Sequence, residues 1–350
     1  MASPDLAKQF AGKLLGIYTG GVLTHLIDIG YQVGLFEASR AGPATSEELS
    51  ARAGLKERYV REWLGAMTTS GIYSYEPESE RYSLPEEHAA LLTGDTAQNL
   101  CPMSRMVDHL GSHLPKLVAC FRAGGGIPYS AYRPVFTQCM DDVWRRIYDQ
   151  QLVGGFVGAV EGLAERLRRG ISVLDVGCGS GHAMNVLARE FPGSRFHGYD
   201  IAEDAIESAR AEAKKMELSN AVFEVADVTD LPGDRKFDLI TAFDAIHDQK
   251  SPDAVLRGIH RALAPDGRFL MIEFKFSSRV EDNIRNPFAP MYYGISLMHC
   301  MPVSLAAGGR GLGAVWGEQT ARELLEKAGF RTVEVVDTPR PQNCIFVCSN

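Results

Sequence analysis

A glycine-rich segment at residues 172–183, SVLDVGCGSGHA, constrains the fold of this chain more than any other feature. An apolar run ends in Asp175, and Gly177, Gly179 and Gly181 follow at alternate positions before a segment with helical character. Glycine residues at the carboxyl end of a strand allow a ligand to approach the backbone where a side chain would block it. The segment therefore predicts a strand, a ligand-binding turn and a helix.

From Ile171 onward the sequence alternates short β-rich segments with helical ones, which is typical of a parallel sheet flanked by helices. The linker between the last two β-rich segments, DTPRPQN, is too short for a crossover helix, so these two strands should pair antiparallel. We therefore predict an α/β domain with a seven-stranded, Rossmann-like sheet whose last strand is antiparallel. The expected strands are 171–176, 195–199, 221–225, 238–243, 267–273, 332–337 and 343–348.

The glycine spacing differs from that of a dinucleotide-binding turn. That turn requires a third glycine three positions after the second, where this chain has His182. Three acids instead follow successive predicted strands: Asp200, Asp227 and Asp244. Taken alone, each of these acids reads as a helix cap or a turn residue. Because parallel strands end at the same edge of a sheet, however, we expect all three to meet there with Asp175.

The glycine turn and the acids together resemble the S-adenosyl-L-methionine site of class I methyltransferases. The resemblance implies that Asp200 accepts hydrogen bonds from the ribose hydroxyls and that Asp227 accepts one from the adenine amine. Asp175 and Asp244 would suit the ammonium and sulfonium of the methionine part. The cofactor-binding residues that it implies are Asp175, Gly177, Cys178, Gly179, Gly181, Asp200, Ile201, Asp227, Val228 and Asp244.

Residues 1–95 are predicted to form a mainly helical winged-helix domain. Thr45 and Glu48 fit a capping box at the start of a helix, and the following segment places Val60, Leu64 and Met67 on one helical face. The segment YSYEPESERYSL then alternates around a turn, as a β-wing does. This order of elements is a helix-turn-helix with a wing.

The first long helix suggests a dimer. From Leu14 to Phe36 the sequence is apolar almost all round, with Asp28 its only charge, so this helix should be buried, most economically against a second copy. The uncharged part, Leu14 to Ile27, is shorter than a bilayer requires. Residues 1–95 contain 8 Lys/Arg and 13 Asp/Glu, which disfavours DNA binding and favours a role in dimerisation and in covering the substrate.

The same region resembles, less specifically, the winged-helix dimerisation domain of small-molecule O-methyltransferases of the plant caffeic-acid type. On that resemblance His247 is the catalytic base and Glu273 the acid that orients it, although this chain has Gln249 where the family has tryptophan. From the residues alone, His247 is equally suited to capping the next turn or shaping a pocket, and Glu273 to pairing with a nearby cation.

Two further segments are candidates for the substrate pocket. Residues 96–165 form a helical connector interrupted by RAGGGIPYSAYRP, read either as a mobile loop over a pocket or as an ordinary interhelical loop. The domain 166–350 contains an insertion, 276–316, rich in Met, Tyr, Pro and Gly, which either lines an acceptor pocket or packs as a lid or on a dimer partner. The candidate substrate residues are Tyr18, Tyr129, Tyr292, Tyr293, His299 and Trp316.

Composition narrows the function further. The net charge is −8, which gives no general attraction to nucleic acid or to anionic membranes. Seven scattered cysteines suit reduced thiols in a cytoplasm, and no zinc-type spacing indicates a metal. We expect a cytoplasmic, homodimeric enzyme that methylates a hydroxyl of a small molecule. The alternatives are a relative that binds the cofactor without methylating, such as a hydroxylase or decarboxylase, and a DNA-binding regulator.

Overall fold

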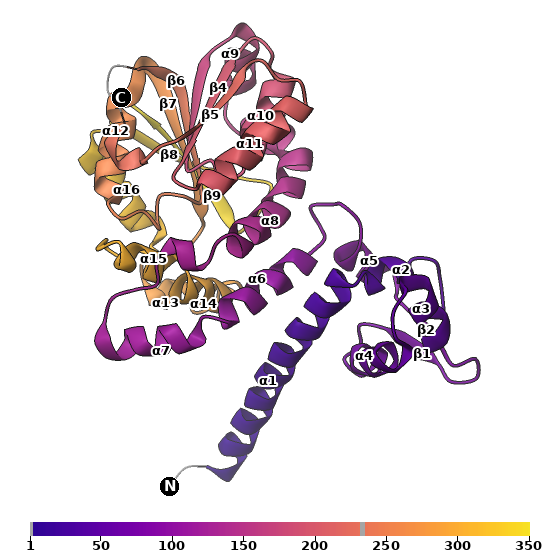
Figure 1. Ribbon diagram of the computed structural model, residues 1–350. Coiled ribbons are helices and arrows are strands. Elements are labelled where there is room, and N and C mark those ends of the chain that lie inside the picture. The colour runs from indigo at the N-terminus through magenta and orange to yellow at the C-terminus, as the bar shows by residue number, and fades with distance from the viewer. Residues whose placement is uncertain (1–2, 232–234) are drawn as a thin grey trace. The chain divides into compact units, whose positions relative to one another are not determined.

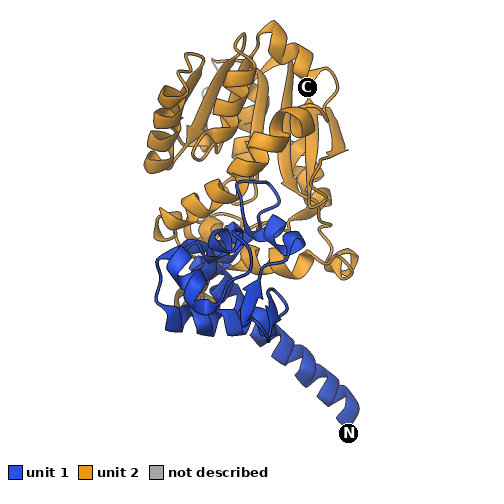
Figure 2. Cartoon of the chain, turned by 90° about the vertical axis from the view of Figure 1, so that its right-hand side faces the viewer, with its two compact units in different colours: residues 1–109 blue, residues 110–350 orange. Residues whose placement is uncertain are grey.

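The computed structural model describes residues 3–231 and 235–350. It divides into two compact units, residues 1–109 and 110–350 (Figure 2). Most of the predicted connector, 96–165, therefore falls in the second unit. Its helices are α6 (Cys101–Gly111), α7 (Leu114–Ala123), α8 (Val135–Gln151) and α9 (Leu163–Arg169), with a π-helical turn at Leu152–Val157 between the last two.

The first unit has the predicted winged-helix order. Its helices are α1 (Pro4–Gln32), α2 (Leu35–Ser39), α3 (Ser46–Ala53), α4 (Glu57–Thr69) and α5 (Glu86–Leu92), and its wing pairs β1 (Ser74–Glu76) with β2 (Arg81–Ser83). The capping box is present, because Thr45 accepts from the Glu48 backbone while the Glu48 carboxylate accepts from the Thr45 backbone. The predicted apolar face of α4 packs into the core of this unit, with Val60, Leu64 and Met67 at most 1% exposed.

Helix α1 is mostly exposed in the single chain. Only Asp28 and Gly30 of its 29 residues are buried, and apolar side chains such as Leu15 and Val22 are at least 60% exposed. The expectation that Leu14 to Ile27 is too short to cross a bilayer does not hold for the helix as a whole. The helix extends well beyond that uncharged segment, and its length and composition alone would allow it to cross a membrane, a test that core helices and signal sequences also pass. Burial against a second copy stays a prediction.

The second unit contains the predicted seven-stranded sheet in the order β5-β4-β3-β6-β7-β9-β8. The strands are β3 (Ser172–Val176), β4 (Arg195–Asp200), β5 (Ala221–Val225), β6 (Phe237–Phe243), β7 (Leu263–Phe274), β8 (Thr332–Asp337) and β9 (Asn343–Ser349). Strand β9 pairs antiparallel with both β7 and β8, while the other pairs are parallel. Both the strand positions and the antiparallel last strand are confirmed.

Helices cover both faces of this sheet. Helices α10 (His182–Glu190) and α11 (Glu203–Lys215) lie on one side, and α12 (Pro252–Ala262) and α16 (Gly317–Ala328) on the other (Figure 1). The predicted insertion falls between the end of β7 and α16 and forms α13 (Val280–Asn283), α14 (Ala289–Met298) and α15 (Cys300–Ala306). This topology brings the carboxyl ends of β3, β4, β5 and β6 to one edge, where parallel α/β sheets bind ligands.

Candidate functional site

A cavity of about 500 Å³ opens at the carboxyl edge of the sheet, in the size range of small-molecule sites. All of its lining residues belong to the second unit. Three groups form the wall: the glycine turn and the strand-end acids, one face of α8 with the loop before it, and part of α15 with the segment that follows β6. The cavity therefore joins the predicted cofactor residues to parts of the connector and the insertion.

The glycine turn opens its backbone toward this cavity. Gly177, Gly179 and Gly181 have φ angles of 74°, 53° and 71°, a region that other residues rarely adopt. A Cβ added at Gly177 would lie 2.7 Å from Ala245, and one at Gly181 would lie 2.5 Å from Phe223. At Gly179 a Cβ would meet nothing within 4 Å. The outer two glycines thus serve close packing, while Gly179 leaves open space at the cavity wall.

Asp200 and the glycine turn hold each other in position. One Asp200 oxygen accepts a hydrogen bond from the Gly179 backbone at 2.9 Å, and the other accepts from the Ala202 backbone at 2.8 Å. Burial raises the pKa of Asp200, while these hydrogen bonds oppose the shift. Asp200 and the adjacent Ile201 both line the cavity, as predicted for the ribose end.

Asp227 caps the chain after β5 and also lines the cavity. Its Oδ1 accepts hydrogen bonds from the backbone and the hydroxyl of Thr229, at 2.9 and 2.6 Å, and these bonds lower its pKa. Asp227 can therefore cap this turn and still face the cavity, because both hydrogen bonds from Thr229 use Oδ1 and leave Oδ2 available to a ligand. Val228 is buried beside it and lines the cavity as well.

Asp175 and Asp244 are the other two acids of the predicted cofactor site. Thr241 donates a hydrogen bond of 2.7 Å to Asp175, whose pKa burial raises to about 7. Asp244 has a φ of 47°, and both of its carboxylate oxygens are buried without a hydrogen-bond partner among the described residues. Burial, followed by repulsion from Glu273, raises the pKa of Asp244 well above 3.8. A buried carboxylate without a partner is costly unless a cationic ligand group compensates it.

These residues fit S-adenosylmethionine on two observations of this structure. The unpartnered carboxylate of Asp244 is complementary to an ammonium, and the open space at Gly179 admits a ligand against the main chain. Asp175 and Cys178 line the same cavity. In the described part of the chain, no group of three or more His, Cys, Asp and Glu side chains is placed to hold a metal ion.

His247 and Glu273 form the predicted pair. The imidazole Nδ1 lies 2.7 Å from a Glu273 oxygen, and the two side chains are 2% and 1% exposed. Neither residue is among those that line the cavity. The indole of Trp316 donates a 3.3 Å hydrogen bond to the same oxygen of Glu273. The pairing predicted from sequence is present, but it lies behind the cavity wall.

The predicted substrate residues divide into two groups. Tyr129 and His299 line the cavity, and their rings meet edge-to-face at 6.0 Å. Tyr292, Tyr293 and Trp316 are not among the lining residues. Tyr292 packs on Phe274 and Phe276, the Tyr293 hydroxyl accepts from Asn283, and Trp316 bonds Glu273.

Tyr18 also lies outside this lining. It projects from α1 in the first unit and is 63% exposed. The insertion therefore contributes to the cavity mainly through α15 rather than through the aromatic residues of α14. Tyr292 is packed, whereas Tyr293 is 38% exposed, and contact of either residue with a substrate stays a prediction.

Helix α8 supplies a wall that the sequence analysis missed. Phe136, Met140, Trp144 and Tyr148 recur every four residues along one face and line the cavity. The rings of Trp144 and Tyr148 stack with centroids 5.2 Å apart. The four-residue spacing was visible in the sequence, but a stripe of this kind is also what an ordinary core helix shows.

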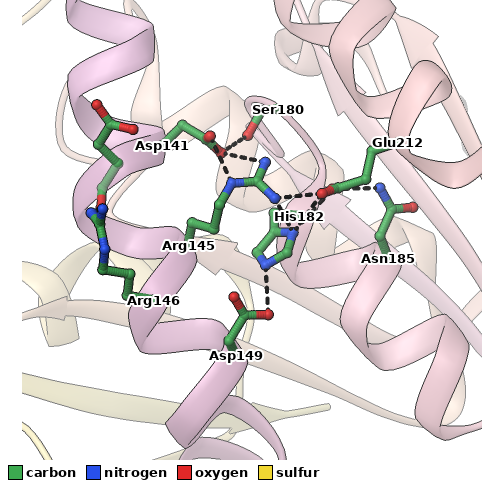
Figure 3. A network of polar contacts seen from close by, with 9 residues as sticks. Asp141, Arg145, Arg146, Asp149, Ser180, His182, Asn185 and Glu212 are labelled. Atoms are coloured by element: carbon green, nitrogen blue, oxygen red, sulfur yellow. Dashed lines mark hydrogen bonds and ion pairs between the residues drawn. The ribbon is translucent and has the colours of Figure 1, made fainter. Parts of the chain in front are cut away.

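A polar network joins α8 to the glycine turn (Figure 3). Asp141 accepts from Arg145 Nε at 2.9 Å and from the Ser180 hydroxyl, so a side chain of the turn bonds directly to the helix. Arg145 also bonds Glu212 and contacts His182 Nδ1 at 2.8 Å. The network thus ties the turn to the aromatic wall.

His182, at the start of α10, is the centre of this network and is 6% exposed. Its Nε2 lies 3.0 Å from Asp149, and its Nδ1 lies 3.0 Å from Glu212. Although burial opposes it, hydrogen bonding to His182, Asn185 and Arg145 lowers the pKa of Glu212 to about 2. His182, which stands where a dinucleotide-binding turn has glycine, therefore links the glycine turn to α8.

Comparison with known proteins agrees with this geometry. Residues 167–329 match the model of a methyltransferase domain, and residues 21–94 match that of an Rv2258c-like winged helix-turn-helix domain. The mitomycin 7-O-methyltransferase MmcR has the same fold, with a TM-score of 0.74 at 20% identity over 99% of both chains. The predicted methyltransferase fold with an amino-terminal winged helix is confirmed.

The curated relatives with the higher sequence identities match only a part of this chain. The methyltransferase GfsG of Streptomyces halstedii is 34% identical over 126 residues, which is 35% of this chain and 45% of that protein. The chain thus spans less than half the length of the curated relatives that it matches at this level. The indolepyruvate C-methyltransferase of Streptomyces griseus aligns over 99% of this chain and 97% of its own length at 24% identity.

Proposed function

Since this chain belongs to the proteins that combine a methyltransferase domain with an Rv2258c-like winged helix-turn-helix domain, we propose that it is an S-adenosylmethionine-dependent methyltransferase acting on a hydroxyl of a small molecule. The observation that carries the proposal is the unpartnered, buried carboxylate of Asp244 at the same sheet edge as the bare Gly179. Arg340 and His247 attract this carboxylate electrostatically, but none of the described residues donates a hydrogen bond to it. A ligand that carries an ammonium group beside a nucleoside would pair with this carboxylate.

The chain's own residues divide the work of binding. All four acids line the cavity, and in this proposal Asp200 and Asp227 accept hydrogen bonds from the ribose and the adenine, while Asp175 and Asp244 surround the methionine part with negative charge. The bound cofactor supplies an activated methyl group. The aromatic face of α8 excludes water and holds a flat acceptor next to this methyl group. Alignment of the acceptor oxygen with the methyl group then supplies a large part of the rate acceleration.

The acceptor class follows from the wall opposite the acids. Phe136, Met140 and Trp144 give that wall an apolar, aromatic surface, which suits a planar ring system. Solved structures of the same fold include mitomycin 7-O-methyltransferase and human N-acetylserotonin methyltransferase. Their names agree with small aromatic acceptors, and we extend that class to this chain as part of the proposal.

We also propose a cytoplasmic homodimer. The apolar and exposed surface of α1 supports a second copy as its cover, because isolated apolar surface of this length is unfavourable in water. The acidic balance of the first unit argues against DNA as the partner of its winged helix. The predicted role of His247 as a base with Glu273 as its orienting acid stays a hypothesis.

The proposal is tested by calorimetric titration with S-adenosylhomocysteine and by transfer of tritiated methyl to a panel of phenols and polyketides. We expect binding with measurable heat and label in at least one phenol. Protein that shows no heat of binding would overturn the proposal. Binding without label or cofactor consumption would instead indicate a relative that uses the cofactor without methyl transfer. Salt-dependent retention of genomic DNA fragments would favour a regulator.

A further inference from the structure

Two adjacent titratable side chains after β6 have different surroundings. His247 is 2% exposed, bonds Glu273 at 2.7 Å and does not line the cavity. Asp248 is partly exposed and lines the cavity together with Asp244 and Tyr129. Among the described residues, no side chain donates a hydrogen bond to the Asp248 carboxylate. The group that faces the acceptor space is therefore Asp248.

Helix α15 of the insertion maintains this arrangement. The Ser304 hydroxyl donates a 3.0 Å hydrogen bond to the Gln249 carbonyl and is 1% exposed, so α15 is fixed to the segment that carries both side chains. The Cys300 side chain, buried on the same helix, is a second hydrogen-bonding partner of the His247 imidazole. The insertion thus closes the space through which His247 would reach an acceptor.

The pKa of His247 also argues against this residue as the proton acceptor. Burial, the largest single effect, opposes protonation of the imidazole, but the charges and hydrogen bonds of Glu273 and Cys300 together raise the pKa of His247 above 6.5. This shift favours the protonated imidazole, which is paired with Glu273 and located next to Asp248.

We propose that Asp248, rather than His247, accepts the proton of the acceptor hydroxyl, with the His247–Glu273 pair positioning it from behind. This inference rests on the proposed methyltransferase function. In the step, the acceptor O–H bond breaks and its proton joins a carboxylate oxygen of Asp248. The electron pair of that bond forms the new bond between oxygen and the methyl carbon, and the pair of the methyl–sulfur bond leaves with the sulfur. The proton later passes from Asp248 to water.

The groups around Asp248 set the pH at which it acts. Burial raises the pKa of Asp248 to about 6, while His247 lowers it and Glu273 and Asp200 raise it. Asp244, Tyr129 and Cys300 also interact electrostatically with this carboxylate, and Lys250 lines the same cavity. Asp248 is therefore ionised at neutral pH and close to the pH range in which a general base is most effective.

The same charges select the acceptor. A carboxylate-bearing acceptor would be repelled by Asp248, whereas an uncharged hydroxyl donates a hydrogen bond to it. We therefore assign a neutral aromatic alcohol as the substrate class.

The test compares 2-naphthol, which carries a donor hydroxyl, with 2-methoxynaphthalene, which does not. Both are titrated by fluorescence into protein saturated with S-adenosylhomocysteine. The wild type should prefer the naphthol by about tenfold or more at pH 7, as expected for a hydrogen bond to a charged group, and should lose the preference below pH 6. Asp248→Asn should lose most of the preference at pH 7. His247→Asn should weaken the preference less than Asp248→Asn does and should move its midpoint to higher pH, because a neighbouring cation that helps to position Asp248 is removed.

Asp266→Asn, an exposed acid at the start of β7, is the matched control and should behave as the wild type. Calorimetry with S-adenosylhomocysteine verifies that each variant is folded and binds cofactor. Equal or undetectable affinity of the wild type for the two probes would overturn the inference, and so would a preference that survives in Asp248→Asn but disappears in His247→Asn. Failure of the proposed function is seen separately, as a wild type that does not bind S-adenosylhomocysteine or transfers no methyl to any acceptor.

Discussion

Asp244 combines features that a chain rarely tolerates together. It adopts a φ of 47°, its carboxylate is buried without a partner among the described residues, and its neighbours include the acids Glu273 and Asp248. Each feature destabilises the folded chain, and such costs gather at sites where a ligand compensates them. The sequence placed this acid correctly at the end of its strand. Its unusual backbone and its missing partners follow from packing, which the local sequence does not encode.

Replacing Asp244 by Asn should affect stability and binding in opposite directions. The pKa of Asp244 is raised in the folded state, so folding favours its protonated form. Its contribution to the free energy of unfolding is therefore highest below pH 3.8 and falls as the pH rises from 3.8 toward the raised pKa. The Asn variant lacks this loss, so its melting temperature should exceed that of the wild type by an amount that grows from pH 5 to pH 8. S-adenosylhomocysteine should bind it about 10- to 100-fold more weakly. Thermal scans and calorimetry measure both, with Asp266→Asn as the exposed control, and unchanged affinity would contradict the assignment.

Gly179 and Gly181 of the turn should respond differently to alanine. At Gly179 the added methyl meets no atom, so the folded chain should lose only the roughly 1–2 kcal/mol of a left-handed residue, while the methyl narrows the cavity. At Gly181 it also collides with Phe223 and Ala209, so the loss of stability should be larger. Urea unfolding and S-adenosylhomocysteine titration separate the two effects. A Gly179→Ala variant that binds like the wild type would show that this position does not face the ligand.

At the scale of elements, α8 connects the two halves of the cavity. One face carries the aromatic wall, and Asp141, Arg145 and Asp149 on the neighbouring face bond the glycine turn and α10 (Figure 3). The sequence predicted a helical connector here, but it did not predict these bonds. Their partners lie 30 to 70 residues away in the chain, and no local pattern reports such a separation.

Replacing Arg145 by Met should loosen both ends of this network. The guanidinium joins Asp141 to Glu212, so its loss leaves partly buried carboxylates without their cation. We expect faster amide exchange in α8 and in residues 177–182 and several-fold weaker binding of S-adenosylhomocysteine. Arg145→Lys should recover only part of the effect, because a lysine cannot replace the two-pronged contact. Lys327→Met on the exposed face of α16 is the control, and unchanged exchange in Arg145→Met would refute the coupling.

At the scale of the whole molecule, α1 presents an apolar surface that the described residues of its own unit leave largely exposed. Its exposed side chains include Leu6, Phe10, Ile17 and Val22. The sequence indicated a buried helix and a second copy as its cover. The tertiary structure adds that nothing within the described first unit covers most of that surface.

The wild-type protein should therefore sediment at twice the chain mass at micromolar concentration, and Val22→Glu should shift it toward the monomer. A charge placed in an apolar interface loses its water without gaining a partner, which weakens association. Tyr59→Glu, at an even more exposed position on α4 (81% against 60% for Val22), should leave the dimer intact. A monomeric wild type that floats with lipid vesicles would show that a membrane covers α1 instead.

The sequence by itself determined the sheet, the winged-helix order and the acids that meet at the carboxyl edge. Parallel strands must end at one edge, so a residue that follows a strand is placed in space by its position in the sequence alone. Only the tertiary structure decided which side chains face the cavity. Of the two neighbours His247 and Asp248, α15 encloses the first and leaves the second open, because access depends on what packs against a side chain, and that packing comes from a segment some fifty residues away.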